Sequence, residues 1–401
     1  MEDGRKQIKF LDDHTAASLR GSQVIGSISR AVEELVLNSI QADAKSIRIK
    51  LSNNNEEVIV QDDGVGINAD AMRRFIGTEY CSTSTGDSDE SRNGKGETLR
   101  SLVSLCVHMK IESCSCYTED KNKKRALSTV NGLSSLNYSK GRCIVQSEKI
   151  FRNGNVISFN QSNKEDDETV ARQVIIPKLD WKSNEHTTGT TVSGTTITLR
   201  GLFHQHAVRR KQHYQACQDK ATNYSYQLIQ TCIRILALSY PHIGFQLFVG
   251  GKVDCAYQSN LESNATTLSL RQKSRALISR LHEMYPTEFE DSLELVHEDS
   301  RTNFRAFGAL CISDEGGSND IDAPRYRDLE MIAINGRVPA QTAVLADAVL
   351  SQVRASRGNR ASEYHNCFAR CIVIFFPPGS LLCYHVRFLC TLLHSHLIQE
   401  L

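Results

Sequence analysis

The sequence predicts a mixed α/β fold arranged in two consecutive units. Segments with apolar residues at the 3.6-residue period of a helix alternate along the chain with short runs rich in Val, Ile and Phe. At 401 residues the chain exceeds what one ordinary hydrophobic core supports. The alternation begins again at about Asn223, which indicates a second unit of the same class.

The first predicted helix contains the stretch AVEELVLNSIQADAK, residues 31–45. One face is apolar at the helical period, with Ile28, Val32, Leu35, Val36 and Ile40. The opposite side carries Glu34, Asn38 and Gln41, and side chains four residues apart on a helix lie one above the other. The period alone favours a solvated polar face over the wall of a binding site.

Two strands are expected next, SIRIKL at 46–51 and EVIVQD at 57–62, and a short helix at 71–75. A long polar loop follows at 81–96. A second helix then starts near Thr98 and leads into the strand HMKIES.

The polar segment 153–168 is expected to be a mobile insertion. GTTITLRGLF at 194–203 returns to β structure, and VRRK at 208–211 ends the first unit.

The second unit is predicted from a helix, a strand, a longer helix and three further strands. These are YSYQLIQTCIRILALS, FQLFVGG, LSLRQKSRALISRLHEMY, SLELVHE, NFRAFGALCIS and LEMIAING. A helix through TAVLADAVLSQVRA and the strand CIVIFF complete the pattern. The expected divisions are residues 1–215, 216–360, and a C-terminal strand and tail at 361–401.

The composition is that of a soluble globular protein, with 40% hydrophobic and 23% charged residues. A formal net charge of +1 gives no global attraction to nucleic acid, so any DNA contact needs a local basic patch. The 13 cysteines form no Cys-x-x-Cys pair, and the N-terminus MEDGRKQIKF lacks the apolar segment of a secretory signal. We therefore expect an intracellular protein with reduced thiols and no membrane contact.

The strand EVIVQD ends in an Asp-x-Gly-x-Gly pattern formed by Asp62, Gly64 and Gly66. Two glycines separated by one residue let the backbone approach a flat or charged ligand, and an aspartate before them can accept a hydrogen bond from an amino group. An ordinary strand-to-loop turn uses the same residues, and on its own this pattern favours such a turn.

The stretch RNGKGETL places Gly94, Lys95 and Gly96 immediately before a helix. Backbone N–H groups at a helix N-terminus, with a lysine beside them, suit an anion. The stretch is neither a Walker A loop nor a Rossmann fingerprint. A plain helix start explains it equally well.

Taken in order, these stretches resemble the four motifs of the GHKL (Bergerat-fold) ATPases: Glu-x-x-x-Asn on a helix, Asp-x-Gly-x-Gly after a strand, a Gly-rich loop with lysine, and Gly-Thr in a later strand. Within that superfamily, EELVLNSIQADAKSIRIKL resembles the EELxxNSxDAxAxxIxV segment of MutL mismatch-repair proteins. NGKGETL resembles their GFRGEAL, GTTITLRGLFHQHAVRRK their GTTVxVxxLFxxxPVRRK, and INGR their VNxR. The chain resembles most the N-terminal region of the eukaryotic MutL homologue 3 branch, a subunit of the MutL-gamma heterodimer.

This resemblance implies the architecture of each part. Residues 1–215 are expected to form a Bergerat-fold GHKL ATPase sandwich. Residues 216–360 are expected to form a transducer α/β domain like domain 2 of ribosomal protein S5, followed by the strand and tail at 361–401.

The resemblance also implies roles in binding ATP and Mg²⁺. Glu34 would be the base for the water that attacks the γ-phosphate, and Asn38 a Mg²⁺ ligand. Asp62 would accept the adenine amino proton, assisted by Thr195 through water, while Gly64 and Gly66 admit the ring. The lid and the phosphate-binding amides would come from Gly94, Lys95, Gly96, Glu97, Thr98 and Leu99.

Several residues depart from the family pattern. Gln41 replaces an aspartate, and the lysine that the family's second domain directs at the γ-phosphate has no counterpart, because Lys273 is the last lysine of the chain. ATP binding is therefore better supported than turnover. Either hydrolysis is slow, or another cation such as Arg337 takes the place of that lysine. The alternative function is a non-hydrolysing, nucleotide-dependent scaffold in a repair or meiotic recombination complex.

The densest basic cluster is Arg209, Arg210 and Lys211. A short run of charges is usually a solvated face, but the resemblance implies contact with the phosphates of double-stranded DNA without base readout. It also implies a nuclear protein that pairs with a MutL-family partner and acts with a MutS-type mismatch-recognition complex. No DQHAxxExxxE-like endonuclease motif occurs in the chain. A GHKL histidine kinase would need a phosphoacceptor helix, which the sequence lacks, and a GHKL chaperone or topoisomerase subunit would leave LFHQHAVRRK unexplained.

Overall fold

The computed structural model describes residues 13–52, 56–74, 76, 97–118, 142–164, 193–215, 224–259, 269–285, 292–299, 304–314, 331–334 and 367–376. The chain divides into two compact units. The first comprises Met1–Cys232 and Gly244–Gln258, and the second comprises Ile233–Ile243 and Ser259–Leu401.

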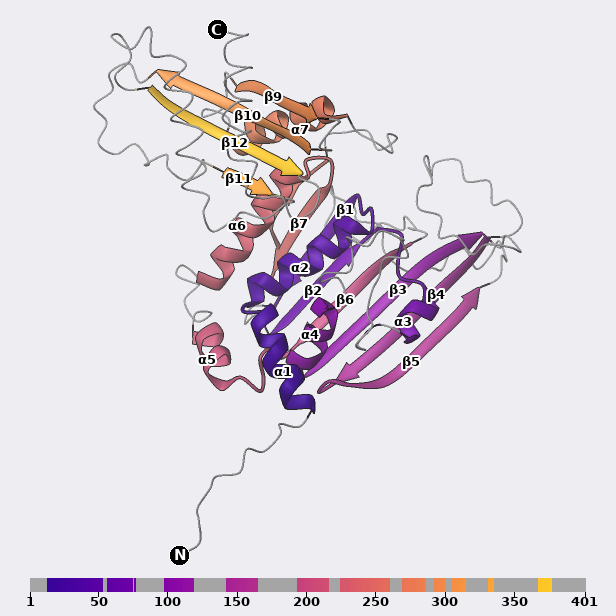
Figure 1. Ribbon diagram of the computed structural model, residues 1–401. Helices are drawn as coiled ribbons and strands as arrows, with labels where there is room; N and C mark the ends of the chain where they lie inside the picture. Colours follow the sequence, from indigo (N-terminus) through magenta and orange to yellow (C-terminus); the bar gives the residue numbers. More distant parts are fainter. Residues whose placement is uncertain are drawn as a thin grey trace, which may run out of the picture. The chain divides into compact units, whose positions relative to one another are not determined.

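The first unit is built on an eight-stranded sheet with the order β5-β4-β3-β6-β2-β1-β7-β8 (Figure 1). Neighbouring strands are antiparallel except for β1 and β7, which run parallel. The strands are β1 Ser46–Leu51, β2 Glu57–Asp62, β3 His108–Thr118, β4 Arg142–Arg152, β5 Asn155–Lys164, β6 Gly194–Arg200, β7 Gly244–Val249 and β8 Lys252–Tyr257.

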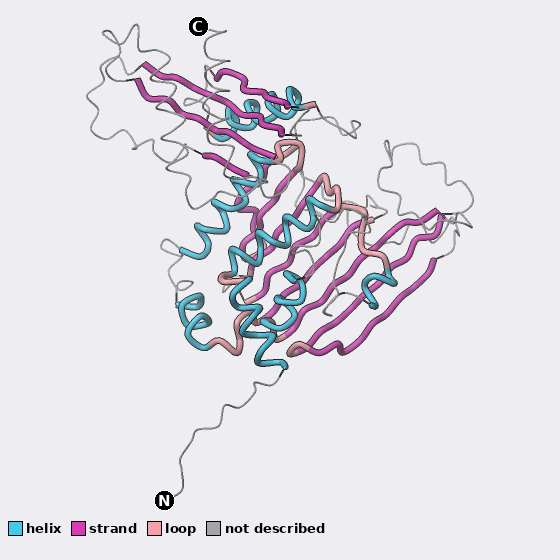
Figure 2. Tube along the Cα trace, viewed as in Figure 1, coloured by secondary structure: helices cyan, strands magenta, loops and turns pink. Residues whose placement is uncertain are grey.

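Four helices lie over one face of this sheet (Figure 2). They are α1 Asp13–Val24, α2 Ile28–Gln41, α3 Ala69–Arg74 and α4 Glu97–Leu105. Two more helices, α5 Ala207–Gln215 and α6 Tyr224–Ser239, follow β6 along the chain. None of the helices in the described part of the chain combines the length and apolar character that a membrane span needs.

The core of the first unit lies between the apolar face of α2 and the strands β1 and β2. The apolar face of α2 buries Val32, Leu35 and Val36, as predicted, and the apolar residues of β1 and most of those of β2 are buried as well. Each such side chain contributes about 1.5–3 kcal/mol when removed from water. Ser27 caps α2, since its hydroxyl accepts a hydrogen bond from the Arg30 amide at 3.1 Å.

The structure corrects the prediction of a mobile insertion at 153–168. Residues 155–164 form β5, which pairs antiparallel with β4. The two strands are joined by Asn153 and Gly154, whose φ angles of 47° and 82° suit a two-residue hairpin turn. The Asn-Gly signal for this hairpin outweighs the polar composition that suggested mobility.

The sequence also placed FQLFVGG in the second unit, and this assignment is wrong. That run is β7, which pairs with β1 from Ser46↔Gly244 to Leu51↔Val249. The expected boundary at residue 215 therefore does not separate the two sheets. A strand with buried residues on both faces joins whichever sheet offers a free edge, which its sequence alone does not reveal.

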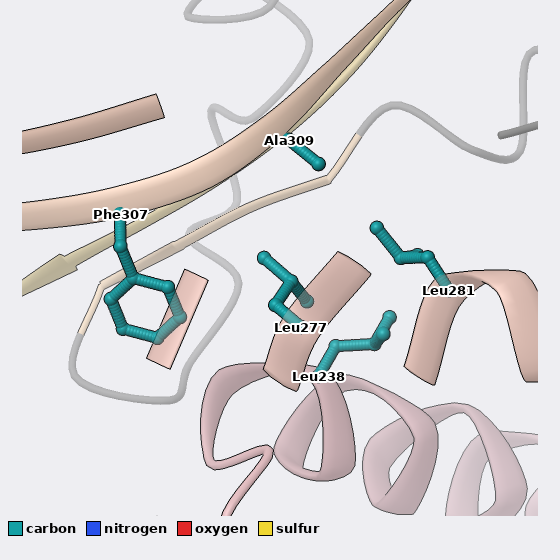
Figure 3. Close-up of a cluster of buried hydrophobic side chains, with 5 residues drawn as sticks. All are labelled: Leu238, Leu277, Leu281, Phe307 and Ala309. Carbon is teal, nitrogen blue, oxygen red and sulfur yellow. The ribbon is translucent and has the colours of Figure 1, made fainter. Parts of the chain in front are cut away.

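The second unit contains a four-stranded sheet with the order β11-β12-β10-β9. Its strands are β9 Ser292–Asp299, β10 Phe304–Asp314, β11 Met331–Ile334 and β12 Cys367–Phe376, and its helix α7 spans Leu270–Met284. Figure 3 shows the core, in which Leu277 and Leu281 of α7 lie with Phe307 and Ala309 of β10 and with Leu238. The predicted likeness to ribosomal protein S5 stays a prediction.

A buried lysine secures α3 against the large sheet. Lys149 of β4 is only 3% exposed, and its ammonium donates to the carbonyls of Met72, Arg73 and Ile76 at 2.9, 3.1 and 2.8 Å. A helix of six residues leaves its last carbonyls without helical partners, so this ammonium supplies their donors.

Replacing that lysine should therefore destabilise the first unit. We expect Lys149→Met to lower the free energy of unfolding by about 2 kcal/mol, because three buried carbonyls lose a donor. Urea denaturation followed by circular dichroism measures this.

The matched control is Lys110→Met on β3, where the lysine side chain is 30% exposed and pairs with Glu112 and Glu148. It should cost less than about 1 kcal/mol. If both variants lowered the free energy of unfolding equally, the role proposed for Lys149 would be contradicted.

Candidate functional site

The buried carboxylate of Asp62 lies at the centre of the candidate site. Asp62 ends β2 opposite Thr195 of β6 and is 5% exposed. Its Oδ2 accepts a hydrogen bond from the Ser39 hydroxyl at 2.8 Å, and its Oδ1 accepts one from the Gly64 amide at 2.9 Å. Burial raises the pKa of Asp62 to about 6, while these hydrogen bonds act in the opposite direction. The carboxylate is therefore ionised, and available as an acceptor, at neutral pH.

Ser39 links this carboxylate to the helix that carries the other predicted residues. Its hydroxyl proton has a second acceptor, the Leu35 carbonyl at 3.2 Å, which is the longer of the two contacts. Asn38 is adjacent to Ser39 in α2 and is half-buried. The Ser39–Asp62 hydrogen bond thus connects α2, which carries Glu34 and Asn38, to Asp62 at the end of β2.

The neighbouring carboxylate, Asp63, has a different function. Its Oδ1 accepts hydrogen bonds from the backbone amides of Lys45 and Ser46, at 2.8 and 2.9 Å, where β1 begins. Burial raises its pKa as well. Of the two adjacent aspartates, Asp63 is therefore hydrogen-bonded to the backbone at the start of β1, and Asp62 is the candidate for ligand contact.

The glycines after Asp62 are required by the packing of the chain itself. Gly66 has φ +75°, and a Cβ at this position would lie 2.0 Å from the Cys114 carbonyl oxygen. A Cβ on Gly64 would lie 2.5 Å from the Ala42 carbonyl oxygen. The turn therefore brings the backbone of β2 close to α2 and β3, and it leaves Asp62 as the side chain at their junction.

Ser113 is a site residue that the sequence reasoning missed. Its hydroxyl accepts a hydrogen bond from the Ile67 amide at 2.7 Å, and it lies 3.1 Å from the Gly194 carbonyl and 3.2 Å from the Thr195 hydroxyl. It thereby connects the glycine turn to Thr195. The available signal was a serine at an inward position of β3, after Met109 and Ile111, where an apolar residue is expected.

Glu34 lies on the same helix, buried between two polar partners. Its Oε1 forms an ion pair with Arg30 Nη2 at 2.6 Å. Its Oε2 lies 3.5 Å from the Thr98 hydroxyl, which makes that hydrogen bond weak. Thr98 and Leu99 are both buried in the first turn of α4. The structure thus brings the predicted base together with the start of the second motif helix.

The phosphate-binding loop proposed from the sequence is only partly covered. Gly94, Lys95 and Gly96 lie outside the described residues. Glu97 begins α4, and Thr98 and Leu99 follow it.

The basic cluster divides into one internal and two external residues. Arg209 Nη1 donates to the carbonyl oxygens of Ser22 and Ile25, at 2.5 and 3.4 Å, and its guanidinium lies 5.8 Å from the centre of the Phe203 ring. Arg209 therefore fixes the junction between α1 and α2. Arg210 and Lys211 are exposed on α5.

The contacts of Gly66 predict a strong local effect of substitution. Gly66→Ala should lower the free energy of unfolding by about 2–4 kcal/mol, because the new methyl group needs both a positive φ and a displaced Cys114 carbonyl. Thermal or urea unfolding measures it.

Gly26→Ala is the control, since a Cβ there meets nothing within 4 Å. It should change stability by less than about 0.5 kcal/mol. If Gly66→Ala were as stable as Gly26→Ala, the close approach of the Gly66 turn to Cys114 of β3 would be refuted.

Part of the chain is similar to known ATPases and DNA mismatch repair proteins. Residues 26–139 match the sequence model of the histidine kinase-, DNA gyrase B-, and HSP90-like ATPases. The human DNA mismatch repair protein Mlh3 is 25% identical over 245 residues, which are 60% of this chain and 13% of that protein. The DNA mismatch repair protein MutL of Clostridium tetani is 26% identical over 252 residues, which are 62% of this chain and 31% of that protein.

The chain thus spans less than a third of the length of these relatives. A crystal structure of the N-terminal domain of a DNA repair protein has the same fold, with a TM-score of 0.55 and 15% identity over 96% of this chain and 97% of that one. The B-subunit of DNA gyrase from Myxococcus xanthus gives a TM-score of 0.54 at 10% identity, over 97% of this chain and 95% of that one.

The predicted fold of the first unit is therefore confirmed. The matched residues 26–139 include α2, β2 and the Asp62 turn. Residues 26–139 thus resemble the histidine kinase-, DNA gyrase B-, and HSP90-like ATPases, and the chain is similar in sequence to the N-terminal region of MutL-type DNA mismatch repair proteins.

Proposed function

We propose that the first unit binds Mg-ATP and hydrolyses it slowly, as the N-terminal ATPase region of a MutL-type mismatch-repair protein. The observation that carries this proposal is the buried Asp62 carboxylate, anchored by Ser39 and Gly64 within the family's Asp-x-Gly-x-Gly turn. A buried anion is costly unless a donor compensates it, and an adenine amino group is such a donor.

The residues around Asp62 suit a flat purine ring. Thr195 faces Asp62 across the β2–β6 pair, and Ser113 connects it to the glycine turn. Asp62 would accept the amino proton, and the turn at Gly64 and Gly66 would form one side of the adenine site. Lys95 and the glycines beside it would contact the phosphates.

The hydrolytic step would rest on Glu34. A carboxylate can take the proton of an attacking water as that water approaches the γ-phosphate. Glu34 suits this role because it is buried, which limits its freedom, and because it lies one helical turn before Asn38.

Asn38 fits a Mg²⁺ ion held mainly by phosphate and water. Its neutral amide oxygen is a ligand type that Mg²⁺ accepts, and the side chain is half-buried rather than enclosed. Bound Mg²⁺ would neutralise part of the phosphate charge. Among the described residues no cluster of three His, Cys, Asp or Glu side chains offers a metal site of its own.

The wider role follows from the relatives rather than from the site. We propose that the chain acts in the nucleus, pairs with a MutL-family subunit and closes on double-stranded DNA when ATP binds, in a pathway started by a MutS-type mismatch-recognition complex. Mlh3 and MutL are named DNA mismatch repair proteins, which supports this assignment.

A second candidate is a scaffold that binds nucleotide without hydrolysing it. Two observations favour it: Lys273 is the last lysine of the chain, and Arg30 occupies one oxygen of Glu34. ATP binding without phosphate release, with DNA and partner present, would support the scaffold.

The two acidic residues should separate binding from turnover. We expect Asp62→Asn to abolish saturable Mg-ATP binding, because the amide presents a donor where an acceptor is needed. Glu34→Ala should keep binding and lose phosphate release. Fluorescent-nucleotide titration and a phosphate-release assay measure the two, and a Glu34→Ala variant as fast as wild type would refute the base assignment.

The stability of Asp62→Asn provides an internal check. The folded-state pKa of Asp62, about 6, exceeds its ordinary value of 3.8, so the folded state binds the proton more tightly than the unfolded chain does. Lowering the pH from about 7.5 to 4 should therefore stabilise wild type relative to Asp62→Asn by roughly 2–3 kcal/mol. A pH-independent difference would show that Asp62 is not buried.

For DNA, we propose Arg210 and Lys211 as the phosphate contacts, because both are exposed on α5 whereas Arg209 binds backbone carbonyls. We expect replacement of both by Ala to weaken double-stranded DNA binding and to reduce the salt dependence by about two phosphate contacts. Fluorescence anisotropy at several salt concentrations measures this.

Lys252→Ala, at an exposed position of β8, is the control and should bind DNA as wild type does. Arg209→Ala should chiefly destabilise the fold, because Arg209 holds the carbonyls of Ser22 and Ile25. Unchanged DNA affinity in the Arg210 and Lys211 variant would exclude α5 as the DNA contact.

A further inference from the structure

Arg30 binds the carboxylates of both Glu33 and Glu34. Its Nη1 lies 2.6 Å from Glu33 Oε2, and its Nη2 lies 2.6 Å from Glu34 Oε1. All three residues are in the first two turns of α2, where the Ser27 cap fixes the backbone at Arg30. The guanidinium is therefore held between two carboxylates by the geometry of the helix.

This arrangement limits what Glu34 can do. A carboxylate oxygen that takes a proton from water needs a lone pair directed at that water. Oε1 is already engaged by an ion pair with Arg30 Nη2 at 2.6 Å, and Oε2 lies 3.5 Å from the Thr98 hydroxyl. Oε1 is free to act only when the ion pair with Arg30 opens.

Glu33 makes such an opening feasible. Because Arg30 contacts Glu33 through its other terminal nitrogen, the guanidinium keeps a partner when Glu34 turns away. The Arg30 side chain is 35% exposed, so water and salt reach this pair. The side chains of Glu33 and Glu34 are 18% and 10% exposed, so the solvent-accessible partner of both ion pairs is Arg30.

We propose that Arg30 is a positioning residue that restrains Glu34 and thereby sets the rate of ATP hydrolysis. Arg30 holds one carboxylate oxygen away from the attacking water, and Glu33 competes for the same guanidinium. The proposal rests on the proposed function, in which Glu34 is the base. Arg30 is not among the residues to which the family motifs assign a role.

The test compares three variants of the full chain for ATP affinity and for phosphate release. Arg30→Gln should release phosphate about two- to fivefold faster at saturating ATP, because the restraint is gone. Its affinity for ATP should stay within about twofold of wild type, since Arg30 acts on the base and not on the nucleotide. Glu33→Gln should be slower than wild type, because Arg30 then has Glu34 alone. Arg30→Lys, which keeps the charge, should lie between wild type and Arg30→Gln.

Arg20→Gln is the matched control, an exposed arginine on α1 whose Nε contacts the Ala16 carbonyl of its own helix. It should match wild type in both assays. Salt gives a second readout: raising KCl from roughly 50 to 300 mM should speed wild type relative to Arg30→Gln, because only wild type has an ion pair to screen. A merely structural role for Arg30 would not produce that difference.

The outcomes distinguish a failure of the Arg30 restraint from a failure of the proposed ATP hydrolysis. If Arg30→Gln is as slow as wild type or slower while Glu34→Ala is inactive, the restraint is refuted and the base assignment stands. If wild type and Arg30→Gln bind ATP and neither releases phosphate, both the restraint and the proposed turnover are refuted, and the scaffold is left. Loss of ATP binding in wild type would overturn the proposed function itself.

Discussion

The candidate site depends on one hydrogen bond, the contact between the Ser39 hydroxyl and the Asp62 carboxylate. It joins the helix that carries Glu34 and Asn38 to the strand that ends at the glycine turn. Without a donor of this kind, an ionised carboxylate at 5% exposure would be strongly destabilising. Ser39 and the Gly64 amide thus let the protein keep an anion inside its core, where it can select a ligand by hydrogen bonding.

Secondary structure was predictable wherever local pattern and tertiary environment agreed. The runs SIRIKL and EVIVQD correspond residue for residue to β1 and β2, and YSYQLIQTCIRILALS corresponds to α6. α1 was missed because DHTAASLRGSQV has no apolar face of helical period. The β4–β5 hairpin was misread from composition, and the place of β7 could not be read at all, because strand partners are chosen by contacts distant in sequence.

The candidate site likewise contains residues that the sequence predicts and residues that it does not. Glu34, Asn38, Asp62 and Thr195 stand out because their spacing follows a recognisable order of motifs. Ser113 and Arg30 do not, since one is a serine within a strand and the other a common helix residue. Their importance comes from what folding brings next to them: the Ile67 amide and Thr195 for Ser113, two adjacent carboxylates for Arg30. Residues that act through a neighbour leave little trace in sequence spacing.

The parallel pairing of β1 with β7 has a consequence for the order of folding. β1 is complete at Leu51, but its partner on that side begins only at Gly244. During synthesis the edge of β1 therefore stays open until nearly two hundred further residues have been made. Such a non-local parallel contact slows folding, and an unpaired edge can recruit another chain. The nascent chain is thus open to misassembly after β1 to β6 have been made and before β7 follows.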